Sequence, residues 1–217
     1  MNNRRDKMKR LKIQLLSFAL ILFAATGAFA STSYNVTVDT SSLSGLTGYL
    51  YMQYISVNGV DSTATVSAFS TDGALASSAS SSVVDGSAVS GSLTDSPYTV
   101  TFANTNGVND YNHGITFGST LSLILTLSDA VSGGIDGGAS TFSLSLFADE
   151  DGTTPLLNTS DDYAGLLLTI NLVNDGSSSY EVLVSQANVS PVPVPAAIWL
   201  FGSGLLGLAG IKRGKRA

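Results

Sequence analysis

Apolar and polar residues alternate with a period of two along most of the chain between residues 31 and 190. The clearest runs cover residues 121–128, 141–148 and 166–172, and shorter runs cover 34–38 and 180–184. Leucine, isoleucine or phenylalanine occupies one face of each long run, and most positions of the other face hold serine or threonine. This pattern is typical of strands with one buried face and predicts antiparallel sheets.

Residues 48–57 are apolar at both odd and even positions, which predicts a central strand covered on both faces. Residues 77–82 are mostly serine, and we expect a loop there. Weaker alternation predicts further strands over residues 64–70, 88–93, 98–102 and 115–117.

Turn chemistry is dense between these runs. Seven Asn-Gly or Asp-Gly pairs offer the positive φ that tight hairpin turns require. No apolar spacing of three to four residues indicates a helix between residues 31 and 190. We therefore predict an all-β domain over 31–190, a two-sheet antiparallel sandwich of jelly-roll type. The seven Asn-Gly and Asp-Gly pairs of this domain begin at Asn58, Asp72, Asp85, Asn106, Asp136, Asp151 and Asp175.

The first 30 residues have the organisation of a secretory signal peptide. Six Lys and Arg precede residue 13, an apolar stretch follows over 13–25, and Ala28 and Ala30 form a small-residue cleavage site. Cleavage would leave Ser31 as the first residue of the mature chain. The alternative, an uncleaved anchor, would need about 20 apolar residues to span a bilayer.

A second apolar segment lies at the C-terminal end. Residues 194–211 carry no charge, and as a helix they would extend for about 27 Å, close to the hydrocarbon thickness of a bilayer. Trp199 lies near the outer end of this predicted transmembrane helix, and Gly202, Gly204 and Gly207 lie within it. Basic residues remain on the cytoplasmic side, so the β-domain would lie outside. The basic tail consists of Lys212, Arg213, Lys215 and Arg216.

A proline motif precedes this span and completes a recognisable order of signals over residues 191–217. The motif is Val192, Pro193, Val194, Pro195 and Ala196, and a Trp-Leu-Phe-Gly-Ser-Gly-Leu-Leu-Gly run begins at Trp199. Motif, span and basic tail together resemble the PEP-CTERM sorting signal of Gram-negative bacteria, in its Val-Pro-x-Pro-Ala variant. Val194 stands where the name-giving form has Glu.

The resemblance implies processing by an exosortase, a membrane transpeptidase with a cysteine nucleophile, after signal peptidase has removed the leader. The inner membrane would hold the chain until the exosortase cuts near the motif. The product would then reach the cell surface or extracellular matrix, in association with exopolysaccharide and biofilm. The body is similar to uncharacterised β-rich domains found with such signals. The alternative is a single-pass anchor that is never cut.

Charge is segregated along the chain, and its distribution argues against a nucleic acid partner. All ten Lys and Arg lie before residue 13 or after residue 211, and of the 16 acidic residues only Asp6 lies outside 13–211. Contacts with nucleic acid phosphates need Lys or Arg, so we expect no nucleic acid partner. The chain has no Cys, which excludes disulfides although export is predicted.

Catalytic chemistry has few candidates. His113 is the single histidine, and we interpret residues 112–114 as a turn with an exposed imidazole. A Ser-His-Asp device would have to use that residue. Zinc is disfavoured by one His and no Cys. We expect no catalytic residues, no bound cofactor and a non-enzymatic protein.

Calcium is the one ion that the composition allows, because it prefers carboxylate and carbonyl oxygens. Acidic residues gather at 149–151 and 161–162, and the candidate ligands are Asp149, Asp151, Asp161 and Asp162. The spacing does not match an EF-hand, and solvated turns are the alternative interpretation.

Carbohydrate binding is the alternative function, with the cell's own exopolysaccharide as ligand. Sugar sites use exposed aromatic side chains, and Tyr98, Tyr111 and Tyr163 fall in segments that we interpret as loops.

Overall fold

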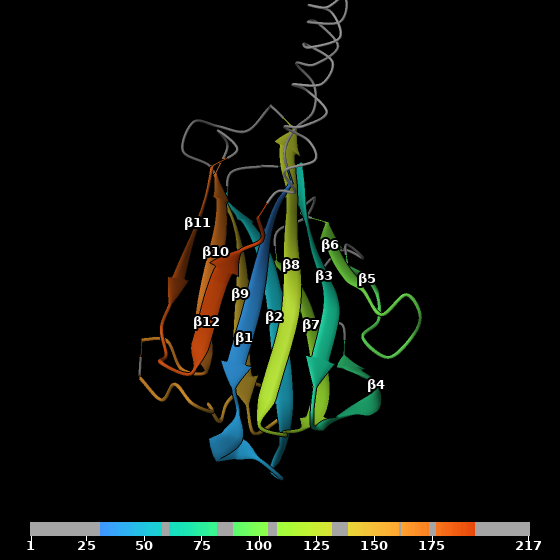
Figure 1. Ribbon diagram of the computed structural model, residues 1–217, viewed down its shortest axis with the longest axis vertical. Coiled ribbons are helices and arrows are strands. Elements are labelled where there is room, and N and C mark those ends of the chain that lie inside the picture. Colours follow the sequence, from blue (N-terminus) through green and yellow to red (C-terminus); the bar gives the residue numbers. More distant parts are fainter. Residues whose placement is uncertain are drawn as a thin grey trace, which may run out of the picture.

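The computed structural model describes residues 31–57, 61–81, 89–103, 108–131, 139–160, 162–173 and 177–193. These residues form two antiparallel six-stranded sheets and one 3-10 turn, η2 (Ser41–Leu43), as Figure 1 shows. The first sheet has the order β12 (Ala187–Pro191), β1 (Thr32–Asp39), β8 (Thr120–Val131), β3 (Asp61–Thr71), β6 (Val100–Ala103), β5 (Val89–Gly91). The second has the order β11 (Ser178–Val182), β10 (Leu166–Val173), β9 (Ala139–Phe147), β2 (Thr47–Val57), β7 (Val108–Thr116), β4 (Ala74–Ser81).

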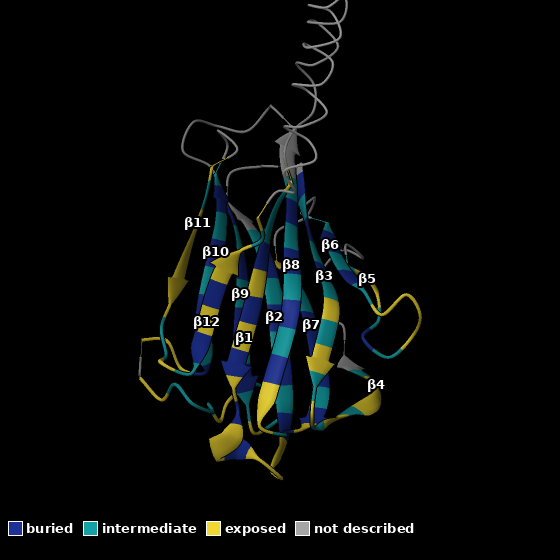
Figure 2. Cartoon of the chain, viewed as in Figure 1, coloured by how far each residue is buried: buried dark blue, intermediate teal, exposed yellow. Residues whose placement is uncertain are grey.

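The core lies between the two sheets and confirms the predicted all-β class. Buried and half-buried residues alternate strictly along β9, and Figure 2 shows the same banding on neighbouring strands. The ring of Phe102 on β6 meets the ring of Phe142 on β9 edge to face, with centroids 6.1 Å apart. Inward-facing leucines of β8, β9 and β10 belong to the same core cluster. Burial of these apolar side chains is the main stabilising force of a domain without disulfides.

Several of the alternating runs, both strong and weak, form strands where the pattern predicts them. Residues 121–128 lie in β8, 166–172 in β10, 34–38 in β1 and 64–70 in β3. The prediction of a central strand over 48–57 is also confirmed, since β2 pairs with β9 on one side and β7 on the other. The prediction that both faces of this strand are covered is wrong, because its outward-facing residues from Tyr49 to Ile55 are only half-buried.

Another prediction on the second sheet is wrong, and a further one is correct in type but not in extent. The predicted loop over residues 77–82 is instead part of β4, apart from residue 82, which lies outside the described residues. Alternating Ala and Ser have too little apolar contrast to reveal a strand, and this strand lies at the sheet edge. The strand expected over 115–117 is β7, which begins seven residues earlier, because its inward positions include Asn109 and His113.

Smaller shifts affect the short strands. β5 and β6 are shorter than the segments 88–93 and 98–102 that the pattern indicates, and β11 ends at Val182 rather than at residue 184. The pattern does not indicate β12 at all. Its inward residues are only Ala187 and Val189, too few for periodicity to be visible.

The turn at Asp72-Gly73 differs from the expected hairpin. It joins β3 of the first sheet to β4 of the second, so the chain crosses between sheets there. Gly73 is not among the glycines with positive φ. A β-carbon at Gly73 would collide with the carbonyl oxygen of Thr116, so close approach of two backbones explains this glycine. Five of the seven predicted turn pairs lie outside the described residues, namely those at 58–59, 85–86, 106–107, 136–137 and 175–176.

The two ends of the described domain lie together. β1 and β12 are antiparallel neighbours, with Tyr34 opposite Pro191. One step further, the backbone N–H of Val192 donates to the carbonyl oxygen of Ser33 at 2.8 Å. Proline is tolerated here because β12 is an edge strand. Within the part of the chain that the structure describes, no helix has the length and apolar character needed to cross a membrane. The predicted leader (1–30) and span (194–211) lie outside that part.

Candidate functional site

The outer face of the second sheet gathers polar side chains from three adjacent strands. Strand register sets them in rows, because side chains opposite each other in a sheet point to the same face. The first row is Asp110 on β7, Gln53 on β2 and Ser143 on β9, and the second is Asn112, Tyr51 and Ser145 on the same strands.

Gln53 and Asp110 are hydrogen-bonded within the first row. The Gln53 side-chain amide donates from Nε2 to Oδ1 of Asp110 at 2.7 Å. Partial burial raises the pKa of Asp110 above its ordinary value, and the bond from Gln53 opposes that rise only in part. The sheet therefore holds a half-buried carboxylate, and residues 13–211 contain no Lys or Arg that could pair with it.

Tyr51 is enclosed by the loop that follows β9. Its ring meets Phe147 edge to face, with centroids 4.9 Å apart. Gly152 has φ +67° and lies against the ring, since a β-carbon there would be 3.4 Å from Cε1 of Tyr51. Burial raises the pKa of Tyr51 to about 12, and the carboxylates of Asp149, Asp151 and Glu150 act in the same direction.

Asp149 closes that loop. Its two carboxylate oxygens accept backbone N–H groups from Thr153 at 2.8 Å and Thr154 at 2.6 Å. These hydrogen bonds lower the pKa of Asp149 to about 2. The loop conformation thus depends on an ionised Asp149.

The calcium prediction stays a prediction. Asp161 lies outside the described residues, while Asp162 is exposed and Asp149 already accepts two backbone donors. No group of three or more potential metal ligands occurs among the residues that the structure describes.

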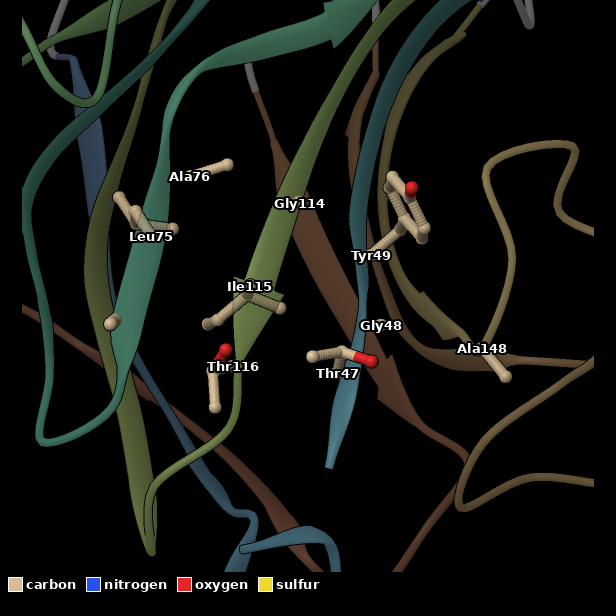
Figure 3. A pocket seen from close by; sticks show the side chains of 10 residues that line it. Thr47, Gly48, Tyr49, Leu75, Ala76, Gly114, Ile115, Thr116 and Ala148 are labelled. Carbon is tan, nitrogen blue, oxygen red and sulfur yellow. The ribbon is translucent and has the colours of Figure 1, made fainter. Parts of the chain in front are cut away.

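Two shallow depressions follow one another along β2 on this outer face. The first, of about 350 Å³, opens over Gly114, with Tyr49 on one side and Leu75 and Ala76 on the other (Figure 3). The second, of about 280 Å³, is polar. Its lining is Tyr51, Gln53, Asp110, Ser143, Ser145, Phe147, Asp151 and Gly152. We call the second depression the polar groove.

Two buried oxygens beside the polar groove have no hydrogen-bond partner among the described residues. They are the phenolic oxygen of Tyr51 and Oδ1 of Asn112, whose backbones are opposite each other across β2 and β7. Buried polar atoms are nearly always paired in folded proteins, so unpaired ones indicate a place for a water or a ligand.

His113 contradicts our interpretation of residues 112–114 as an exposed turn. It lies within β7, faces the core and is 0% exposed. Its Nε2 donates to the carbonyl oxygen of Ala76 at 3.0 Å, so Nδ1 is free to accept from the hydroxyl of Tyr111, also at 3.0 Å. The Tyr111 oxygen in turn accepts the N–H of Leu93 at 3.1 Å. Both imidazole nitrogens therefore serve the structure.

The three candidate sugar-binding tyrosines do not form one site. Tyr111 is 2% exposed and belongs to the His113 network, so its interpretation as a loop residue is wrong. Tyr98 and Tyr163 are exposed, but they lie in connections of different sheets, before β6 and before β10. The sequence pattern misses Gln53, Asp110 and Tyr51 because only strand register brings them together.

The predicted sorting residues are described only in part. Ser31 is exposed ahead of β1, and Val192 and Pro193 follow β12 directly. The remaining residues lie outside the described part, namely Ala28, Ala30, Val194, Pro195, Ala196, Trp199, Gly202, Gly204, Gly207, Lys212, Arg213, Lys215 and Arg216.

The chain matches no protein-family model, no curated protein and no solved structure.

Proposed function

We propose that this chain is an exported, non-enzymatic β-domain that an exosortase processes for display at the cell surface or in the extracellular matrix. The ordered signals at the two ends of the sequence motivate the proposal. Signal peptidase and the exosortase would be its processing partners, with the inner membrane as a transient anchor.

The pairing of β1 with β12 is the observation that carries this proposal. It brings Ser31, where the mature chain would begin, to the same end of the sandwich as Val192 and Pro193, the first two residues of the proline motif. A domain tethered at one end can fold and remain clear of the membrane while both termini are cut. This arrangement suits a chain whose two processing events occur at one membrane surface.

The chemistry of the described domain agrees with a non-enzymatic role. His113 is buried with both ring nitrogens engaged, so it is not available to activate a nucleophile. Residues 13–211 contain no Lys or Arg to stabilise a developing negative charge.

The strand order supports a jelly-roll-like classification. The first eight strands have the order β1-β8-β3-β6 in one sheet and β2-β7-β4 in the other, with β5 added beside β6. Double-sheet jelly rolls occur in structural and binding domains such as viral capsid proteins and lectins, and they have no single chemistry in common.

Mass spectrometry of the exported protein tests the proposal. The full chain is expressed in a host that carries an exosortase and in the same host with the exosortase gene deleted. We expect an extracellular product that begins at Ser31 and lacks peptides from residues 199–217 in the first host only. Intact C-terminal peptides in the extracellular fraction of the first host would contradict processing.

A matched pair of variants makes this test specific. Pro195→Ala alters the proline motif beyond the folded strands, and we expect it to retain the C-terminal peptides in the membrane fraction. Pro155→Ala removes a proline from the loop between β9 and β10 and is expected to be processed as the natural chain is. Equal processing of both variants would remove the motif from the mechanism.

A further inference from the structure

We infer that the polar groove on the outer face of the second sheet is a binding site for a neutral polysaccharide. This inference goes beyond the proposed sorting route and does not depend on it, because it concerns only side chains of the folded domain. It also replaces the loop tyrosines with a different set of residues.

The groove offers hydrogen-bonding groups of the kinds that recognise hydroxyl-rich ligands. Asp110 and Asp151 are carboxylates that accept hydroxyl protons, while the hydroxyls of Ser143 and Ser145 can both donate and accept. The bond from Gln53 holds the Asp110 carboxylate in one orientation, so less side-chain freedom is lost when a ligand binds.

Unpaired polar atoms provide the second, independent observation. Asn112 is 94% buried, as its 6% exposure implies, and its side-chain oxygen has no partner among the described residues. It lies two residues from Asp110 on β7 and so points to the same face. The phenolic oxygen of Tyr51, its neighbour across the strands, is unpaired as well. Of the two residues, Tyr51 lines the groove and Asn112 lies next to it on the neighbouring strand.

Charge selects a neutral ligand. The groove contains two carboxylates, and Asp149 and Glu150 act on Tyr51 from the adjacent loop. No Lys or Arg occurs between residues 13 and 211, so an acidic polysaccharide would meet repulsion without any compensating ion pair. A sugar with free hydroxyls can instead donate to the carboxylates and place its apolar C–H groups against the aromatic side chains of Tyr51 and Phe147.

The size of the site favours a polymer over a single sugar or a metal ion. The polar groove of about 280 Å³ and the depression of about 350 Å³ over Gly114 follow one another along β2. Tyr51 lines the polar groove and Tyr49 lines the other depression, and the two residues are about 6.6 Å apart along the same face of β2. An extended chain of sugar units can therefore occupy both depressions in succession.

Affinity gel electrophoresis of the full chain in mild detergent tests this inference. The gels contain dextran, galactomannan or xyloglucan as neutral probes, and polygalacturonate as an anionic one. We expect at least one neutral polymer to retard the protein, no retardation by polygalacturonate and no effect of EDTA. Absence of retardation in all three neutral gels would overturn the assignment, and so would retardation that EDTA abolishes, since a metal bridge would then hold the glycan.

Variants separate the groove from the rest of the surface. Asp110→Ala is expected to raise the dissociation constant for the retarding polymer at least tenfold, and Tyr51→Phe is expected to raise it at least threefold. Asp95→Ala removes the same charge from an exposed loop of the first sheet and should leave binding unchanged. Gln53→Ala, also expected to weaken binding, keeps the test decisive if Asp110→Ala does not fold. Equal affinity of the groove variants and Asp95→Ala would refute the site. Because unprocessed chain is used, a failed sorting experiment has no bearing on this result.

Discussion

The backbone amide of Val192 donates to the carbonyl oxygen of Ser33 at 2.8 Å, beyond the last register pair of β12 with β1. Ser33 lies close to the predicted mature N-terminus, and Val192 is the first residue of the proline motif. The hydrogen-bond ladder of the first sheet therefore continues up to the motif without a spacer. An enzyme that cuts close to the motif would work at the edge of the folded domain.

Val189 secures β12 to this edge, and truncating it should loosen the strand. Val189 is opposite Val36, and both side chains are buried. We expect Val189→Ala to lower the free energy of unfolding by about 2 kcal/mol, through lost apolar burial and the cavity left behind. Urea unfolding of the purified full chain measures this. The neighbouring Asn188→Ala, on the exposed side of the same strand, should change little, and equal losses in both variants would contradict the packing described for β12.

The Tyr111 hydroxyl joins His113 on its own strand, β7, to the segment after β5, so removing it should cost more than removing a surface hydroxyl. Tyr111→Phe leaves Nδ1 of His113 and the N–H of Leu93 without partners. We expect a loss of about 1–3 kcal/mol, the usual penalty for buried unpaired polar groups. Urea unfolding at pH 7 checks this, with Tyr163→Phe on an exposed side chain as the matched control. A loss no larger than in the control would show that the network contributes nothing.

Asp110 should oppose folding at neutral pH. Its pKa is raised by burial, so the folded state holds the proton more tightly than the unfolded state does. Ionisation at pH 7 is therefore unfavourable to the folded state. This penalty shrinks as the pH falls through the raised pKa of Asp110 and is gone below the ordinary value of 3.8. We expect Asp110→Asn to unfold at higher urea concentration than the natural chain at pH 7, with the difference narrowing toward acid pH.

A stabilising Asp110→Asn that also weakens polysaccharide binding would indicate that the carboxylate is kept for its ligand rather than for the fold. Asp95→Asn in the exposed loop before β6 is the control and should leave the unfolding midpoint unchanged. A lower midpoint for Asp110→Asn than for the natural chain at pH 7 would contradict an unfavourable ionisation of Asp110 in the folded state.

Asp149 should have the opposite pH dependence. Its pKa falls from 3.8 to about 2 because the ionised carboxylate accepts backbone N–H groups of Thr153 and Thr154. A lowered pKa stabilises the folded state above pH 3.8, and this contribution is lost as the pH falls through 2. We expect the natural chain to lose stability between these values more steeply than Asp149→Ala does.

Circular dichroism during acid titration measures that difference, and Glu150→Gln in the same loop is the matched control. The control should retain the acid-sensitive loss of the natural chain. If Asp149→Ala retains it too, the hydrogen bonds from Thr153 and Thr154 do not govern the loop.

Much of the fold was predictable because large apolar residues alternate with serine and threonine along the long strands. The leucines of β8 and the inward residues of β10 determine which face is buried, whatever the partner strand. The same logic failed for β4, whose small residues carry no contrast, and for β7, whose inward face holds a histidine and an asparagine that the structure pairs internally.

The sequence by itself determined the all-β class, the extent of the body, the segregation of charge and the candidate signals at its two ends, because these depend on local composition and period. Only the tertiary structure decided that His113 is a core residue and that Asp110, Gln53 and Tyr51 share one face. Their proximity depends on which strands become neighbours and on the register between them, since a slip of one residue would turn these side chains to the opposite face.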